Sequence, residues 1–185
     1  ASLDLPGNVR IVGTIFSTNG LASMDDVEFA PVNGKLTLGS DIDFITGNIT
    51  VAENDTFDMD IYDLVLANRK TVMNNGIWLA PESDSKFICL GNATFDGLDM
   101  NFSYLIANSS FTDTLIFNGG NSYVISDSLI LTGADGSELL ITSDDLFSRA
   151  TVILDNTGGT QFIDYVKVYD VNGTIDNHIA ADNSW

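Results

Sequence analysis

Short apolar runs separated by turn-forming residues dominate the chain, most clearly between residues 114 and 173. Runs of three to five apolar residues bounded by Gly, Asn, Asp and Ser are typical of β-strands, and strands this short do not fold alone. They have to stack on further copies of the same unit, as in a solenoid or a sandwich. No segment sustains a helical period over ten residues, so we predict an all-β fold with less than about 10% helix.

The spacing of the runs favours a solenoid. The apolar runs recur from Ile130 to Ile153, from Ile116 to Leu140 and from Leu140 to Val166. Each of these steps spans roughly 23 to 26 residues, which is about the length of one coil of a parallel β-helix. We therefore predict a right-handed parallel β-helix, or β-solenoid, with a jelly-roll-like β-sandwich as the alternative.

The 185 residues are expected to form a single all-β domain, 1–185, because a chain of this length can bury one core. The repeat fades before about residue 85. Residues 1–85 are thus expected to be less regular, as a cap or irregular coils, and residues 86–185 more repetitive. Alternating apolar residues in the repetitive part should point into one core: Leu115, Phe117, Leu129, Leu131, Val152 and Leu154.

Three local patterns give further expectations. Residues 63–70 (DLVLANRK) are the best helix candidate in the chain, and residues 9–16 are typical of one strand. Pro31, Val32, Asn33 and Gly34 have the chemistry of a hairpin turn between strands at 27–29 and 35–38.

Charge excludes several kinds of partner. The chain has 26 Asp and Glu against 7 Lys and Arg, a formal net charge of −19 at pH 7, and the cations are scattered. Without a basic patch we expect no nucleic-acid binding. No apolar run approaches the roughly 18–20 residues that span a bilayer, so we expect no membrane insertion. Self-repulsion on this scale is relieved by salt or by divalent cations.

Carboxylates at short spacing make calcium the candidate ion. Asp58, Asp60 and Asp63 offer hard oxygen ligands at the spacing Asp-x-Asp-x-x-Asp, although no EF-hand loop is present. Two shorter groups, at 53–55 and 135–138, share this character. Structural calcium at Asp58, Asp60 and Asp63 is the cofactor hypothesis, and no other cofactor is expected.

Six Asn-x-Ser/Thr sequons are candidate glycosylation sites. They begin at Asn48, Asn54, Asn92, Asn101, Asn108 and Asn172. The single cysteine, Cys89, lies in an apolar run and is expected to be a buried, inert thiol.

Catalytic patterns are weak. Asp144 and Asp145 with Arg149 are the closest approach to the clustered carboxylates and cation of β-helix polysaccharide lyases and hydrolases. The only histidine, His178, is typical of a surface loop. A sugar-binding platform would draw on Trp78, Tyr104, Tyr123 or Trp185.

Residues 113–185 resemble the β-helical repeat regions of large secreted surface proteins of bacteria and archaea, in the style of filamentous haemagglutinin adhesins. The segments that carry the resemblance are TLIFNGGNSYVISDSLILTGADGSELLITS and ATVILDNTGGTQFIDYVKVYDVNGTIDNHIAADNSW, with short apolar strands and Gly-Gly or Asn-Gly corners. It implies an extracellular or cell-surface location, which the start at Ala1-Ser2, without a methionine, also fits if a signal peptide has been removed.

We therefore expect a non-enzymatic extracellular structural protein that assembles with itself into a surface layer, sheath, filament or adhesin stalk. One alternative is a β-sandwich module that binds glycans or accepts a donor strand from its neighbour. A β-helix carbohydrate-active enzyme is the other.

Overall fold

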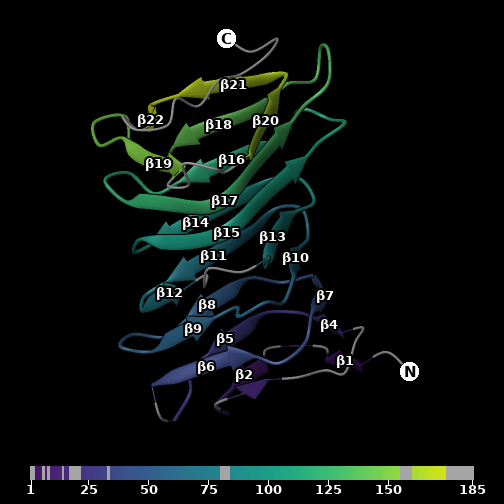
Figure 1. Ribbon diagram of the computed structural model, residues 1–185, viewed down its shortest axis with the longest axis vertical. Helices are drawn as coiled ribbons and strands as arrows, with labels where there is room; N and C mark the ends of the chain where they lie inside the picture. The colour runs from purple at the N-terminus through teal and green to yellow at the C-terminus, as the bar shows by residue number, and fades with distance from the viewer. Residues whose placement is uncertain are drawn as a thin grey trace.

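The computed structural model describes residues 3–5, 7, 9–13, 15–16, 22–32, 34–79, 84–154 and 160–173. Its strands are stacked in coils along the long axis, with the first strands at one end and the last at the other (Figure 1). Within the described residues there is no helix, and none that could span a membrane.

The strands of each coil fall in turn on three faces. Face 1 contains β1 (Leu3–Leu5), β4 (Ala22–Met24), β7 (Ile42–Ile45), β10 (Leu64–Leu66), β13 (Lys86–Cys89) and β20 (Thr160–Asp164). Face 2 contains β2 (Val9–Ile11), β5 (Val27–Phe29), β8 (Ile49–Val51), β11 (Lys70–Asn74), β14 (Ala93–Gly97), β16 (Thr114–Phe117), β18 (Leu139–Ser143) and β21 (Val166–Tyr169). Face 3 contains β3 (Ile15–Phe16), β6 (Lys35–Leu38), β9 (Thr56–Asp58), β12 (Ile77–Leu79), β19 (Ala150–Leu154) and β22 (Val171–Gly173).

Two long strands join faces 3 and 1 into one sheet. β15 (Met100–Asn108) and β17 (Ser122–Thr132) begin on face 3 and end on face 1, and their pairing shifts register between Phe102 and Tyr104, where they pass the corner. Every ladder between named strands in the described chain is parallel, which confirms the predicted β-solenoid and removes the jelly-roll alternative.

The coil repeat is regular over much of the chain. On face 2, Val27, Ile49, Val72, Phe95 and Phe117 stack in register, each beside the next. The coils between them are nearly equal in length, and the coil that leads from Phe117 to its partner Ser143 is longer. On face 2 the register seen after residue 85 therefore also holds between residues 27 and 85, whereas on face 1 the pairing of β7 with β10 shifts register between Leu64 and Leu66.

Alternating side chains from all three faces fill the interior. Phe29 stacks on Phe57 with ring centroids 4.2 Å apart, and Phe57 meets the edge of Trp78 at 4.7 Å. Higher in the stack, Phe95 lies on Phe117 at 5.0 Å. The six residues predicted to share the core are all buried, each at most 6% exposed: Leu115, Phe117, Leu129, Leu131, Val152 and Leu154.

Two local predictions are wrong. Residues 63–70 form no helix, because Leu64 and Leu66 alternate with Val65 on β10 and point inward. Pro31 and Gly34 do form a turn, with the Gly34 N–H donating to the Pro31 carbonyl over 3.2 Å, but the turn is a solenoid corner. It leads from β5 on face 2 to β6 on face 3, which do not pair with each other.

Two further details differ. Residues 9–16 form two strands, β2 and β3, on neighbouring faces. The residues that mark the spacing of the runs do not lie beside one another, since Ile130 lies beside Phe162 and Ile116 beside Thr142. Leu140 lies beside Lys167 and not beside Val166.

Candidate functional site

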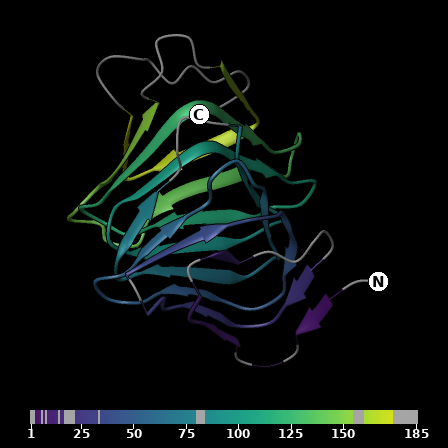
Figure 2. The same ribbon diagram turned by 60° about the horizontal axis from the view of Figure 1, so that its bottom comes forward.

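The N-terminal end of the solenoid has strands that are paired on one side only. Among the described strands, β1 pairs with β4, β2 with β5 and β3 with β6, and none has a partner on its other side. Figure 2 brings this end of the stack forward. A parallel β-sheet that ends without a cover presents a row of backbone donors and acceptors to any further strand.

The hydrogen bonds of β2 show which of its backbone groups face outward. The Val9 N–H donates to the Asp26 carbonyl over 2.8 Å, and the Ile11 carbonyl accepts from the Ala30 N–H over 2.9 Å. Both residues therefore direct their backbone polar groups toward β5. Because successive residues of a strand address opposite neighbours, the N–H and carbonyl of Arg10 point away from the sheet.

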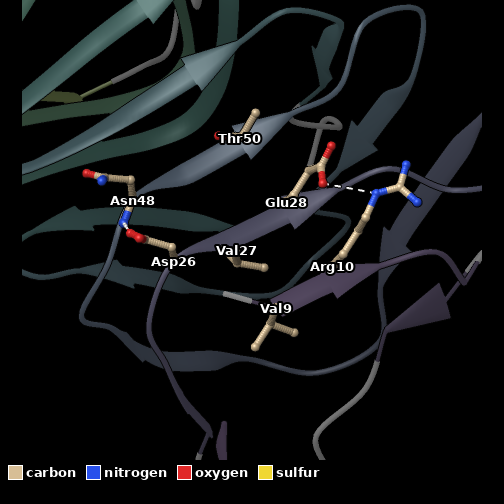
Figure 3. Close-up of a pocket in the computed structure, with 7 residues that line it drawn as sticks. All are labelled: Val9, Arg10, Asp26, Val27, Glu28, Asn48 and Thr50. Atoms are coloured by element: carbon tan, nitrogen blue, oxygen red, sulfur yellow. Dashed lines mark hydrogen bonds and ion pairs between the residues drawn. The ribbon is translucent and has the colours of Figure 1, made fainter. Parts of the chain in front are cut away.

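A shallow depression lies on the outer surface of face 2 beside this edge (Figure 3). Residues of β2, β5 and β8 and the corners before them line it: Val9, Arg10, Asp26, Val27, Glu28, Asn48 and Thr50. Arg10 Nε is 3.0 Å from Glu28 Oε2, and the Asn48 N–H donates to Asp26 Oδ1 over 2.6 Å. Its polar groups bind one another between coils, and no two carboxylates converge on a common point.

Similar bonds between coils recur at the corners. Asp63 N–H donates to Asp41 Oδ1, and Lys86 N–H donates to Asp63 Oδ1, each over 2.9 Å. At the next corner the Asn68 side-chain carbonyl oxygen accepts from Asn92 N–H over 2.9 Å. A carboxylate or amide on one coil thus fixes the backbone of the following coil, which accounts for much of the Asp and Asn content of the chain.

Asn92 makes several of these bonds with one side chain. Its Oδ1 accepts from Thr114 N–H over 2.9 Å. Its Nδ2 donates to Asn68 Oδ1 over 3.0 Å and to Asp113 Oδ1 over 2.7 Å. Asp113 is buried and its second oxygen accepts from the hydroxyl of Ser109. One side chain therefore links three successive coils.

Asp25 lies at the corner between β4 and β5. Hydrogen bonds from the Gly7 N–H, at 2.8 Å, and from the Thr46 hydroxyl, at 2.6 Å, hold the pKa of Asp25 below its usual range. The bond from Gly7 ties the first described coil to the second. Ionised Asp25 is therefore part of the contact that holds the N-terminal end in place.

The three predicted calcium ligands have separate partners. Asp58 pairs with Lys35 at 2.7 Å and accepts a 3.0 Å bond from the Asp60 N–H, whereas Asp63 pairs with Lys86 at 3.4 Å. Asp60 is a corner residue with φ of 50°. Over the described ranges no three acidic, histidine or cysteine side chains form a group suited to a metal ion. Calcium at Asp58, Asp60 and Asp63 stays a prediction.

The two shorter acidic groups differ. Glu138, from the group at 135–138, pairs with Lys167 at 3.2 Å. Hydrogen bonding to a backbone N–H and to Lys167 lowers the pKa of Glu138. In the group at 53–55, Glu53 and Asn54 are exposed.

The residues that come nearest to an enzyme pattern bind separate partners. Asp144 accepts from the Gly119 N–H over 2.6 Å and so binds a corner of another coil, whereas Asp145 accepts from the Phe147 N–H over 2.8 Å within its own loop. Arg149 reaches Asn172 at 3.5 Å instead of either carboxylate. His178 lies outside the described residues.

The aromatic platform is largely absent from the surface. Trp78 and Tyr123 are at most 1% exposed and belong to the core, so neither can stack on a sugar. Tyr104 is half-buried, and Trp185 lies outside the described residues. Cys89 is 1% exposed, as predicted, and burial raises the pKa of its thiol.

The sequon asparagines differ in accessibility. Asn48, Asn54, Asn108 and Asn172 are exposed, whereas Asn92 and Asn101 are half-buried. A glycan would be attached at the Nδ2 atom of the asparagine. In Asn92 this atom donates hydrogen bonds, one of them to Asn68 Oδ1 over 3.0 Å, and in Asn101 it donates to the Trp78 carbonyl over 3.4 Å. Glycosylation stays a prediction, and the exposed set is the better substrate.

Comparison of the chain with protein-family models, with curated proteins and with solved structures found no match. The unpaired edge at Arg10 could not be found from the sequence, because strand order decides which strand lies at an end. An outward-facing apolar column on face 1 was also missed. Its signal is the apolar middle residue of the triplets Leu-Val-Leu at 64–66 and Leu-Ile-Leu at 129–131, but single triplets of this kind, such as Leu-Ile-Phe at 115–117, also occur on other faces.

Proposed function

We propose that this chain is a non-enzymatic structural protein whose copies assemble through the N-terminal edge of the solenoid. The observation that carries the proposal is the edge itself, with strands on all three faces that have no described partner on their outer side. The resemblance of residues 113–185 to secreted surface proteins supports an extracellular or cell-surface setting, in a layer, sheath, filament or stalk.

The occupant that we propose for this edge is a second copy of the chain. Strands of a second copy would bond to the outward groups of residues such as Arg10, as in other cases of β-strand addition. The formal charge of −19 opposes this contact at low ionic strength. Salt at about 1 M shortens the Debye length to about 3 Å and should permit it.

A proline at position 10 tests the edge. Proline removes the outward N–H of β2, whereas the bonds of Val9 and Ile11 to the next coil remain. The matched control is Arg10→Ala, which removes the Glu28 ion pair and keeps the N–H. That pair is exposed, so its loss should cost at most about 1 kcal/mol.

In sedimentation velocity at high salt, we expect Arg10→Ala to associate like the parent and Arg10→Pro to remain monomeric. Melting curves of both variants establish that the fold is kept. Equal association of Arg10→Pro and Arg10→Ala would show that the edge is not the contact.

A further inference from the structure

One outward-facing column of side chains on face 1 is apolar from β10 to β20, whereas on β7, the strand before β10, Asp43 and Phe44 lie between the two residues that pair with β10. Val65, Ile88, Ile106, Ile130 and Phe162 stand next to one another in register on β10, β13, β15, β17 and β20. The first four are half-buried by their neighbours in the sheet, and Phe162 is 56% exposed. We call these five residues the face 1 column.

The other faces have no equivalent among their described residues. On face 2, one outward column runs Glu28, Thr50, Met73 and Asp96. Another runs Thr71, Thr94, Ile116, Thr142 and Tyr169. On face 3, Thr56 is followed by Ile77, and Asn101 by Val124. Single exposed apolar residues are ordinary on a protein surface, but an uninterrupted column on one face alone is not explained by strand propensity.

The surroundings of the column are almost free of net charge. The outward neighbours on one side run Asp63, Lys86, Tyr104, Ser128 and Thr160, and Asp63 pairs with Lys86. Those on the other side include Asn108, Thr132 and Asp164. Asp63, Lys86 and Asp164 are therefore the charges in these two flanking columns, and the ion pair between Asp63 and Lys86 leaves one net negative charge there, on a chain whose net charge is −19.

We propose that face 1 is a lateral contact surface between copies of this chain. Two copies of a strongly acidic protein approach at least electrostatic cost through a surface with little net charge. The column is also complementary to the same column on a second copy. Both columns repeat at the strand spacing of about 4.8 Å, so the side chains of one can fit between those of the other. The proposal rests on the proposed function, since it names a second surface for the same self-assembly.

The size of the column sets the strength of this contact. Five strands at about 4.8 Å and a width of roughly four residues at about 3.3 Å each give about 300 Å² per copy. A total near 600 Å² is below the range of stable, specific interfaces, which begins at about 1,200 Å². The lateral contact is therefore weak for two isolated copies. It becomes effective when copies already joined at their ends present several faces together.

Cross-linking at the centre of the column tests the proposal. Cys89 is buried, so Ile106→Cys introduces the reactive surface thiol, and a short bis-maleimide is the probe. The matched control is Thr94→Cys, an outward position in the middle of face 2. Face-to-face contact should make Ile106→Cys cross-link about tenfold faster than Thr94→Cys, because contact raises the effective thiol concentration. Equal rates would overturn the proposal, whether the face is bare or binds some other molecule.

A second pair of variants separates this contact from the end contact. Ile106→Glu adds a carboxylate to the column, and Thr94→Glu adds the same charge to face 2. At high salt, Ile106→Glu should still form the end-joined species that Arg10→Pro abolishes, but no larger ones, whereas Thr94→Glu should behave as the parent. If Ile106→Glu still forms the larger species, the lateral contact is contradicted and the end contact is not. Cross-linking of Ile106→Cys that survives in the Arg10→Pro background would leave the lateral contact standing without the end contact.

Discussion

The side chain of Asn92 offers the sharpest test of how the coils are held together. In Asn92→Ala, the Thr114 N–H loses its acceptor and the buried Asp113 carboxylate loses a donor. A hydrogen bond to a charged group contributes about 1.5–3 kcal/mol, and a neutral one about 1 kcal/mol. Asn68 keeps its bond from the Asn92 N–H. We expect the free energy of unfolding to fall by about 2–4 kcal/mol.

Urea unfolding followed by circular dichroism measures this loss. A change of 1 kcal/mol moves the melting temperature of a protein of this size by about 2–4 °C, so thermal melting gives an independent reading. The matched control is Asn75→Ala, because Asn75 is an exposed corner residue. Surface substitutions of that kind stay within about 0.5 kcal/mol. If Asn92→Ala unfolds within that margin of the parent, the corner bonds do not stabilise the stack.

Three further predictions concern the backbone, the core and pH. Gly97→Ala should destabilise the protein by several kcal/mol, because φ is +90° and a Cβ would meet backbone atoms of the coil below. The control is Gly34→Ala, where φ is +78° and the space around the residue is open. In the same urea titration this control should lose only about 1 kcal/mol of stability. Leu131→Asp places a carboxylate at a position 6% exposed, and should cost several kcal/mol; melting like the parent would show that Leu131 does not face the core. Asp25→Asn should be less stable than the parent above about pH 4, and the difference should vanish as pH falls further. The reason is that a carboxyl group whose pKa is lowered in the folded protein stabilises the fold only while it is ionised. If melting at a series of pH values shows a difference that grows on acidification, this prediction is wrong.

The sequence was sufficient to predict the fold class because inward residues alternate so regularly. Pairs such as Leu115 with Phe117 and Leu129 with Leu131 are spaced for one face of a strand, and all four are buried. The register between neighbouring strands was harder to predict from the sequence. Ile116 and Ile130 are apolar but point outward, so the apolar residues that mark the spacing in the sequence are not those that lie side by side in the sheet.

Corner chemistry misled the prediction for a different reason. A Pro-x-Asn-Gly sequence specifies a tight change of direction and does not determine whether the next strand returns beside the first or moves to another face. In this chain the change of direction at residues 31–34 leads to another face. The candidate site depended on tertiary arrangement even more strongly, since Asp58 and Asp63 meet lysines from other coils and not each other.

Sedimentation velocity of the parent protein under increasing salt tests the claim of self-assembly most directly. One series uses sodium chloride and a second uses calcium chloride at matched ionic strength, so that screening and chelation by carboxylates are separated. We predict a monomer at low ionic strength and ordered oligomers as screening increases, at lower ionic strength in calcium if carboxylates chelate it. A protein that remains monomeric through both series would contradict the account.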